Sequence, residues 1–263
     1  MKIVVCIKQV PDTVEVKIDP KTGTLIRDGV PSIINHDDKT GIEAALTLKE
    51  QVGGTVTVVS MGPPQADVAL REALAMGCDE AILVSGREFG GSDTYATSGI
   101  LAAALKKIGY DLIITGRQAI DGDTAQVGPQ IAEKLHVPQV SYVEEIKEAA
   151  EDYVVVRRQF EDGYHIIKIK TPCLLTAIAE LATPRYMTVR GIVEAYEKEI
   201  KILDFEALKD GLELDMIGLK GSPTNVYQSF TKEVKGAGTI LKDLSADEAV
   251  KAIVAKLEEK FII

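Results

Sequence analysis

The segment from Gly116 to Gly128, GRQAIDGDTAQVG, has the composition of a ligand-binding loop. It follows a short apolar run, Leu112–Thr115, and leads into residues with helical spacing. Glycine lets the backbone approach a ligand, and Gly122 is placed to do so. Free N–H groups and the positive dipole end at a helix start attract anions. We predict a helix that begins at Thr124 or Ala125, with a phosphate site at its start that uses the N–H groups of Ala125, Gln126 and Val127.

Two carboxylates complicate this prediction. Asp121 and Asp123 flank the loop, and a carboxylate repels a phosphate. A purely structural interpretation is that Asp123 or Thr124 caps the helix, which both residue types do well. The two interpretations are compatible if one side chain caps the helix while the backbone amides bind the phosphate.

A second glycine-rich connection, Gly86–Asp93, also precedes a segment with helical spacing. Thr94 and Thr97 lie three residues apart at the start of that segment, so they share one face, which either faces a ligand or is a capping and solvated face. Gly90–Thr94 is similar to the phosphate loop of ATP pyrophosphatases, but it follows the third apolar run instead of the first. We interpret it as a loop beside the cofactor, with a plain surface loop as the alternative.

Motifs that carry their own chemistry are missing from the sequence. It contains no GxSxG, Walker A, HExxH or complete GxGxxG pattern. The three cysteines are far apart among apolar residues, which is typical of reduced core thiols, and the three histidines lack metal-ligand spacing. We therefore expect no metal site and no catalytic side chain, and any redox chemistry requires a bound cofactor.

Composition excludes several other classes. The chain has 263 residues, a formal net charge of −10 and only 5% aromatic residues, which disfavours binding of nucleic acid by charge or by base stacking. No stretch approaches the roughly 20 apolar residues that span a bilayer. The first apolar run, Ile3–Ile7, is too short for a secretory signal. We expect a cytoplasmic protein that does not bind membranes.

The loops above are positioned by an alternation of short apolar runs and helical segments. Such runs, apolar on both faces, are typical of parallel strands covered by helices. The order predicts an open, mostly parallel Rossmann-like α/β sheet, in which ligands lie beyond the carboxyl ends of the strands. The predicted strands are Ile3–Ile7, Val56–Ser60, Ala81–Ser85, Leu112–Thr115 and Cys173–Ile178, and the predicted helices are 38–51, 65–76, 94–107 and 124–135.

Other segments depart from this rhythm. We predict pairs of short β segments within 17–32 and within Tyr153–Ile169, the latter a β-hairpin inserted in the sheet. Residues 1–183 are predicted to form the nucleotide-binding domain, and 184–263 an extended arm that ends in a helix. That helix begins with a capping box, Ser245 and Glu248, and the apolar terminus, Phe261–Ile263, requires another surface to cover it.

Taken together, the sequence resembles the beta subunit of electron-transfer flavoprotein over nearly its whole length. The resemblance is carried by IVVCIKQVPD (3–12), MGP (61–63), ALAMG (73–77), the loop 116–128 and a signature over Val156–Thr176. His165 departs from the family pattern, which usually has Glu or Gln there. The resemblance implies a sheet of the adenine-nucleotide-hydrolase type and a heterodimer with an alpha subunit that carries FAD.

The resemblance also implies a nucleotide on this chain. In the common respiratory branch that nucleotide is a structural AMP, and in the bifurcating branch it is a second FAD, which NADH reduces. The segment Asp121–Pro129 looks like the bifurcating, anaerobe-type version, because Gly122 replaces a bulkier acid and leaves room for a diphosphate. The implied cofactor-binding residues are Cys6, Asn35, Asp37, Met61, Thr94, Thr97, Gly116, Ala119, Gly122, Asp123, Thr124, Ala125, Gln126 and Val127.

In the leading hypothesis NADH delivers a hydride to this FAD. One electron passes to the alpha-subunit FAD and on to an acyl-CoA dehydrogenase, and the other passes to ferredoxin or flavodoxin. A non-bifurcating subunit with AMP is the alternative, and a stand-alone nucleotide-binding or AMP-forming enzyme is an alternative of another class.

The segment Ala179–Val189 resembles the recognition loop with which the family docks on an acyl-CoA dehydrogenase. We expect docking through Pro184, Arg185, Tyr186 and Val189. The family's leucine anchor is Val189 here, which buries less area.

Overall fold

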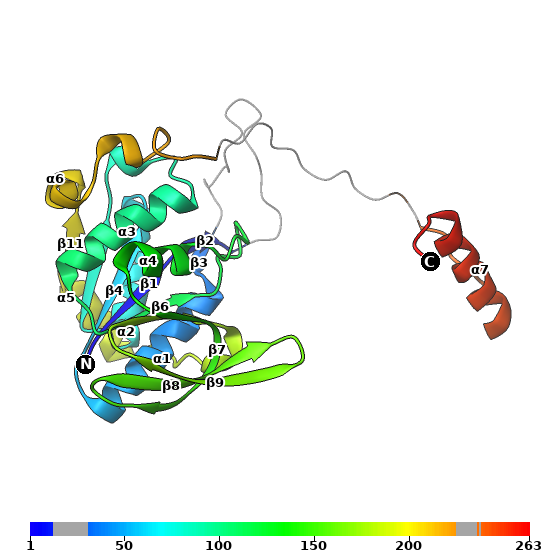
Figure 1. The fold of residues 1–263 in the computed structure, drawn as a ribbon, viewed down its shortest axis with the longest axis horizontal. Coiled ribbons are helices and arrows are strands. Elements are labelled where there is room, and N and C mark those ends of the chain that lie inside the picture. The colour runs from blue at the N-terminus through cyan, green and yellow to red at the C-terminus, as the bar shows by residue number, and fades with distance from the viewer. Residues whose placement is uncertain (13–30, 225–235, 237) are drawn as a thin grey trace.

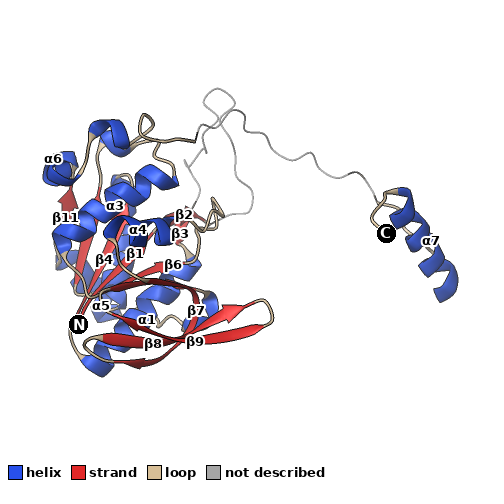
Figure 2. Ribbon diagram, in the orientation of Figure 1, coloured by secondary structure: helices blue, strands red, loops and turns tan. Residues whose placement is uncertain are grey.

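The fold is an open α/β sheet, seen in a computed structural model that describes residues 1–12, 31–224, 236 and 238–263. The described residues form one sheet of nine strands in the order β11-β5-β4-β1-β6-β10-β7-β8-β9 and one of two strands, β2 and β3 (Figures 1 and 2). The strands are β1 (Lys2–Ile7), β2 (Gln9–Pro11), β3 (Ser32–Ile34), β4 (Thr55–Met61), β5 (Glu80–Val84), β6 (Leu112–Gly116), β7 (Gln139–Ala149), β8 (Tyr153–Phe160), β9 (Gly163–Lys170), β10 (Cys173–Ala177) and β11 (Ile200–Leu203).

Helices cover both faces of this sheet. One face carries α1, α2 and α5, and the other carries α3, α4 and α6. Short 3-10 turns precede α2 and α3 and lie at 179–181, 209–211 and 214–216. The helices are α1 (His36–Val52), α2 (Asp67–Met76), α3 (Thr94–Ile108), α4 (Val127–Leu135), α5 (Val189–Glu197), α6 (Phe205–Leu208) and α7 (Ala246–Glu259).

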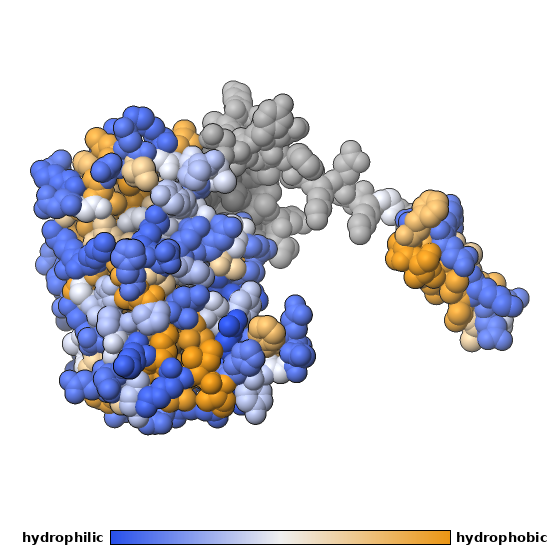
Figure 3. Space-filling model, viewed as in Figure 1, coloured by the Kyte–Doolittle hydropathy of each residue, from blue (hydrophilic) through white to orange (hydrophobic). Residues whose placement is uncertain are grey.

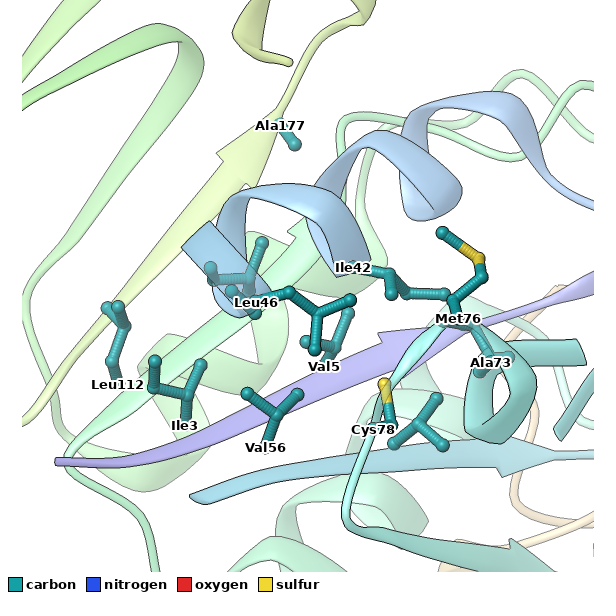
Figure 4. Packing of buried hydrophobic residues seen from close by; sticks show 14 of the residues in the cluster. Ile3, Val5, Ile42, Leu46, Val56, Ala73, Met76, Cys78, Leu112 and Ala177 are labelled. Atoms are coloured by element: carbon teal, nitrogen blue, oxygen red, sulfur yellow. The ribbon is translucent and has the colours of Figure 1, made fainter. Parts of the chain in front are cut away.

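The central strands are buried because both of their faces are apolar. On β1, Ile3 and Val5 face α1, while Val4 and Cys6 face the opposite layer. Figure 4 shows the first of these layers, with side chains of α1 lying over β1, β4 and β6. Helix α1 approaches the sheet closely at Gly41, where an added Cβ would lie 3.0 Å from Ile114 Cγ2. Burial on both sides explains why these strands read as continuous apolar runs.

Most elements follow the sequence prediction. The parallel strands, the helices and the hairpin within Tyr153–Ile169 are confirmed, and the β segments predicted within 17–32 lie almost entirely outside the described residues. The prediction for α4 is wrong at its start, because the helix begins at Val127 and not at Thr124 or Ala125. The sequence prediction does not include strands β2, β3, β7 and β11 or helices α5 and α6.

After residue 184, one stretch of the chain packs on the α/β body, and the final helix does not. Strand β11 pairs in parallel with β5, and Arg71 on α2 donates to the carbonyl of Ala195 on α5, so this stretch is built onto the α/β body. Helix α7 is drawn apart from the body in Figure 1, and none of its residues is buried in the described part of the chain. The boundary at 183 and the packing of the arm on a partner stay predictions.

We searched the described helices for one that could span a membrane. None in the described ranges combines the length and the hydropathy that crossing a bilayer requires.

Two helical glycines give a test of the packing. A Cβ on Gly128 of α4 would lie 2.6 Å from Thr115 Oγ1 and 3.0 Å from Thr176 Cγ2, both on the sheet. We predict that Gly128→Ala lowers the free energy of unfolding by about 1–3 kcal/mol through overpacking. Gly99→Ala in α3 is the matched control, because its Cβ would meet only the end of Lys134, and it should raise stability by about 0.5–1 kcal/mol. Urea unfolding measures both, and equal effects would contradict the close approach of α4.

Candidate functional site

A large cavity opens at the carboxyl ends of β1, β4, β5 and β6. Its volume is about 900 Å³, and it lies where the chain order reverses, because β4 and β6 flank β1 on opposite sides. Parallel α/β sheets bind their ligands at such a switch point. The volume is near the upper end of the range for small-molecule and cofactor sites.

The floor of the cavity is held by the carboxylate of Asp38, near the start of α1. Its two oxygens accept the N–H groups of Lys8, 2.7 Å away, and of Gly116, 2.9 Å away. Lys8 follows β1 and Gly116 ends β6, so one side chain joins the ends of the two strands that flank the switch point. A Cβ on Gly116 would lie 2.2 Å from Asp38 Oδ1, which explains why glycine is needed there.

Burial controls the protonation of the groups at this floor. It raises the pKa of Asp38 to about 7, although hydrogen bonds from Lys8, Asn35 and Gly116 oppose the rise. Burial, with the nearby Asp38 carboxyl as a smaller cause, raises the pKa of the Cys6 thiol to about 12. Cys6 is therefore a neutral thiol that contributes surface and not a nucleophile.

The loop 117–126 forms the next wall. Buried Asn35 orders it, because its side-chain amide donates to the carbonyl of Gln118 at 2.8 Å and its oxygen accepts the N–H of Ile120 at 3.1 Å. Asp123 and Ala125 have positive φ angles of 49° and 52°, conformations that turn their peptide groups away from helical directions.

The start of α4 is free of the capping that the sequence suggested. Its N-cap is Gln126, and no side chain of the described residues accepts a hydrogen bond from the first turn. The interpretation of Asp123 or Thr124 as the cap is therefore wrong. The N–H groups of Val127 and Gly128 remain open to an anion, together with the positive end of the helix dipole. A Cβ on Gly122 would meet no described atom within 4 Å, so that face of the loop is open.

Three acids around the loop lie close to basic or amide groups. Asp121, one of the two carboxylates expected to repel a phosphate, pairs with Lys8 Nζ at 2.7 Å. Asp37 lies 3.7 Å from Arg117, and Asp123 accepts a hydrogen bond from the Gln118 side chain at 2.8 Å. Asp121 and Asp37 therefore each lie beside a base and Asp123 beside an amide donor, which lowers their repulsion of a phosphate.

The loop 86–93 forms the opposite wall. Asp93 caps α3 by accepting the N–H of Ala96 at 3.0 Å. Thr94 follows and donates to the side-chain oxygen of Gln126 at 2.8 Å, so the two predicted binding loops are in direct contact. Thr97, one turn further on, also lines the cavity.

The structure brings most of the predicted cofactor residues together. Asn35, Asp37 and Asp123 do not line the cavity but hold the loops behind it. Sequence reasoning missed Asp38 and Lys8, for which the only signal was a second acid beside Asp37 and a base after the first strand. The predicted residues that line the cavity are Cys6, Met61, Thr94, Thr97, Gly116, Ala119, Gly122, Thr124, Ala125, Gln126 and Val127.

The predicted docking residues lie elsewhere, after β10. Arg185 is bound to α1 of its own chain, with contacts of 2.9 Å to Glu43 and 2.7 Å to Glu50. These hydrogen bonds raise the pKa of its guanidinium. Pro184 is half-buried, whereas Tyr186 and Val189 are 97% and 82% exposed. Arg185 thus anchors the segment that presents the other two.

Comparison with known proteins identifies the family. Residues 22–221 match the model of the electron transfer flavoprotein domain. The chain is 57% identical to the electron transfer flavoprotein subunit beta of Clostridium acetobutylicum, and 55% identical to the caffeyl-CoA reductase-Etf complex subunit CarD of Acetobacterium woodii. It is 54% identical to the acryloyl-CoA reductase electron transfer subunit gamma of Anaerotignum propionicum. Each match covers 100% of both chains.

A Rossmann-like sheet with a nucleotide-sized cavity at its switch point defines the class of this protein. The chain belongs to the electron transfer flavoprotein family, among its beta-type subunits.

The buried acid predicts a pH dependence of stability. The folded-state pKa of Asp38 lies above its unfolded value of 3.8, so the stability that it contributes is full below about pH 4 and is lost as the pH rises to about 7. We predict that wild type loses stability relative to Asp38→Asn by up to about 1.4 kcal/mol per pH unit in this window, with no further change above it. Urea unfolding at several pH values tests this. Asp152→Asn, on an exposed turn, is the control, and parallel profiles for wild type and Asp38→Asn would contradict the prediction.

Proposed function

We propose that this chain is the beta subunit of an electron-bifurcating flavoprotein and that its cavity binds FAD. Bound FAD would supply the redox chemistry, with NADH as the hydride donor. Electrons would then be divided between the FAD of an alpha subunit, which serves an acyl-CoA dehydrogenase, and a ferredoxin or flavodoxin. The observation that carries the proposal is the open, glycine-bearing loop before an uncapped helix, in a cavity of about 900 Å³.

The residues present fit a dinucleotide. The free N–H groups at the start of α4 suit a diphosphate, and the space beside Gly122 leaves room for it. Met61 and Cys6 offer apolar surface on the β1 and β4 side, where an adenosine would lie. The hydroxyls of Thr94 and Thr97 are on the opposite wall. That of Thr97 would donate a hydrogen bond to the flavin ring, and that of Thr94, which donates to Gln126, would accept one.

The chain's own contribution is binding and orientation. The cavity presents a buried neutral thiol, a buried carboxyl already bonded to two backbone N–H groups, and paired charges. The names of two relatives, which belong to a caffeyl-CoA reductase complex and an acryloyl-CoA reductase, favour a partner enzyme that acts on an acyl-CoA. Exposed Tyr186 and Val189 would form part of that docking surface.

The arm would bind the alpha subunit. Helix α7 exposes Val250, Ile253 and Val254 on its surface, and Figure 3 shows this apolar side of the helix in orange. An exposed apolar stripe next to an apolar terminus fits a subunit contact.

The nucleotide content decides between FAD and the second candidate, AMP. We predict two FAD per heterodimer when the chain is expressed with its alpha subunit, and bleaching of flavin absorbance by NADH. Acid extraction followed by chromatography measures the nucleotides. One FAD and one AMP would establish the non-bifurcating alternative, and turnover of ATP by the chain alone would favour the stand-alone enzyme.

Substitution at Gly122 tests the placement of the phosphates. Because a Cβ there would meet no described atom within 4 Å, Gly122→Leu should fold normally yet obstruct the ligand. We predict a weakening of FAD binding by about tenfold or more, which corresponds to about 1.4 kcal/mol. Gly163→Leu is the matched control, since its Cβ is equally free and it is the first residue of β9, which does not line the cavity. Unchanged FAD affinity in Gly122→Leu would contradict the placement.

A further inference from the structure

One wall of the cavity is held from outside by the first part of the C-terminal arm. This part, residues 217–224, is called the arm root here. It follows α6 and lies against the loop 88–93, which is far away in the sequence but lines the cavity. The function described so far does not use the arm root.

Hydrogen bonds join the two segments at closely spaced points. The hydroxyl of Ser222 accepts the N–H of Asp93 at 2.8 Å, and the hydroxyl of Ser92 accepts the N–H of Gly218 at 3.1 Å. The N–H of Leu219 donates to the carbonyl of Gly90 at 3.1 Å. Three residues of the loop, Gly90, Ser92 and Asp93, are thus bonded to the arm root.

The packing at this contact leaves little space. Gly91 and Gly218 both have positive φ angles, of 75° and 62°. A Cβ on Gly91 would lie 3.1 Å from Leu219 Cβ, and one on Gly218 would lie 2.3 Å from the carbonyl oxygen of Glu88. Ser222 is buried, at 8% exposure. The loop 88–93 and the arm root therefore pack against each other in a single register. Packing as close as this is typical of a protein interior and not of a loose surface contact.

Asp93 connects the arm root to the ligand side of the wall. Its Oδ1 atom caps α3, while its Oδ2 atom accepts the N–H of Thr224 at 3.0 Å and the hydroxyl of Thr224 at 2.5 Å. The next residue, Thr94, points to Gln126 in the other binding loop. One series of hydrogen bonds therefore runs from Thr224 through Asp93 and the start of α3 to the loop before α4.

We propose that Ser222 and Thr224 are positioning residues of the nucleotide site. Their hydroxyls hold the loop 88–93 and the start of α3 in the orientation that presents Thr94 and Thr97 to the bound nucleotide. The proposal rests on the proposed function only in that the cavity binds a nucleotide, and it applies to FAD and to AMP alike.

The experiment compares nucleotide affinities of stripped heterodimer, with FAD and AMP as separate probes in calorimetry. Thr224→Val keeps the shape and the N–H donor but removes the hydroxyl. The hydroxyl bonds the Asp93 carboxylate that caps α3, so we expect its removal to weaken binding by about tenfold or more. Thr224→Ser, which keeps the hydroxyl, should stay within about twofold of wild type. Ser222→Ala should weaken binding in the same direction.

The control separates positioning from stability. Thr188 also caps a helix with its hydroxyl, which accepts the N–H of Gly191, but that helix is α5, away from the cavity. Thr188→Val should lower the urea midpoint without changing the affinity. Wild-type affinity in folded Thr224→Val, while Gly122→Leu loses binding, would overturn the positioning role and leave the site intact. Binding of AMP but not FAD by wild type would overturn the FAD assignment alone, and the Thr224 variants would then be judged on AMP.

Discussion

The carboxylate of Asp38 is the interaction on which the site depends. By accepting the N–H groups of Lys8 and Gly116 it joins the ends of β1 and β6, which are neighbours in the sheet although their connections run in opposite directions. Without an acceptor at this point, two backbone donors at the floor of the cavity would be unpaired, and each would cost about 1–3 kcal/mol. Burying the Asp38 carboxyl is unfavourable, but its hydrogen bonds fix the ends of the two strands at the switch point.

The rest of the site depends on a cavity floor that is fixed in position and on charged side chains around it that are paired. Lys8 is paired with Asp121, and Arg117 lies 3.7 Å from Asp37, so these pairs leave no large unbalanced charge at the cavity. An anion would be attracted by oriented N–H groups instead. This explains how a chain with a net charge of −10 could hold the proposed phosphate site. The local field at the start of α4 decides the binding of a phosphate at contact distance, whereas net charge acts at long range and is screened.

Sequence reasoning reached the parallel strands because each, such as Leu112–Gly116, is apolar on both faces. It did not predict β11 or β7, because their burial is partial and polar residues such as Lys201 and Glu148 are exposed. It placed the start of α4 too early because Asp123 and Thr124 look like caps, while the positive φ of Ala125 delays the helix. The role of Asp38 could not be predicted from the sequence, because it depends on two strand ends that only the folded sheet brings together.

The arm root is a second place where residues far apart in the sequence together fix a wall of the cavity. A glycine-rich loop such as 88–93 has high conformational entropy, and ordering it for a ligand costs about 1–2 kcal/mol per residue if the ligand must do so alone. The contacts from Ser222 and Thr224 meet that cost before any ligand binds. Since the same hydrogen bonds continue through Asp93 to Thr94 and Gln126, the two walls of the cavity are ordered together. Thr224, which is 131 positions from Asp93 in the sequence, therefore contributes to the proposed binding site although it does not line the cavity.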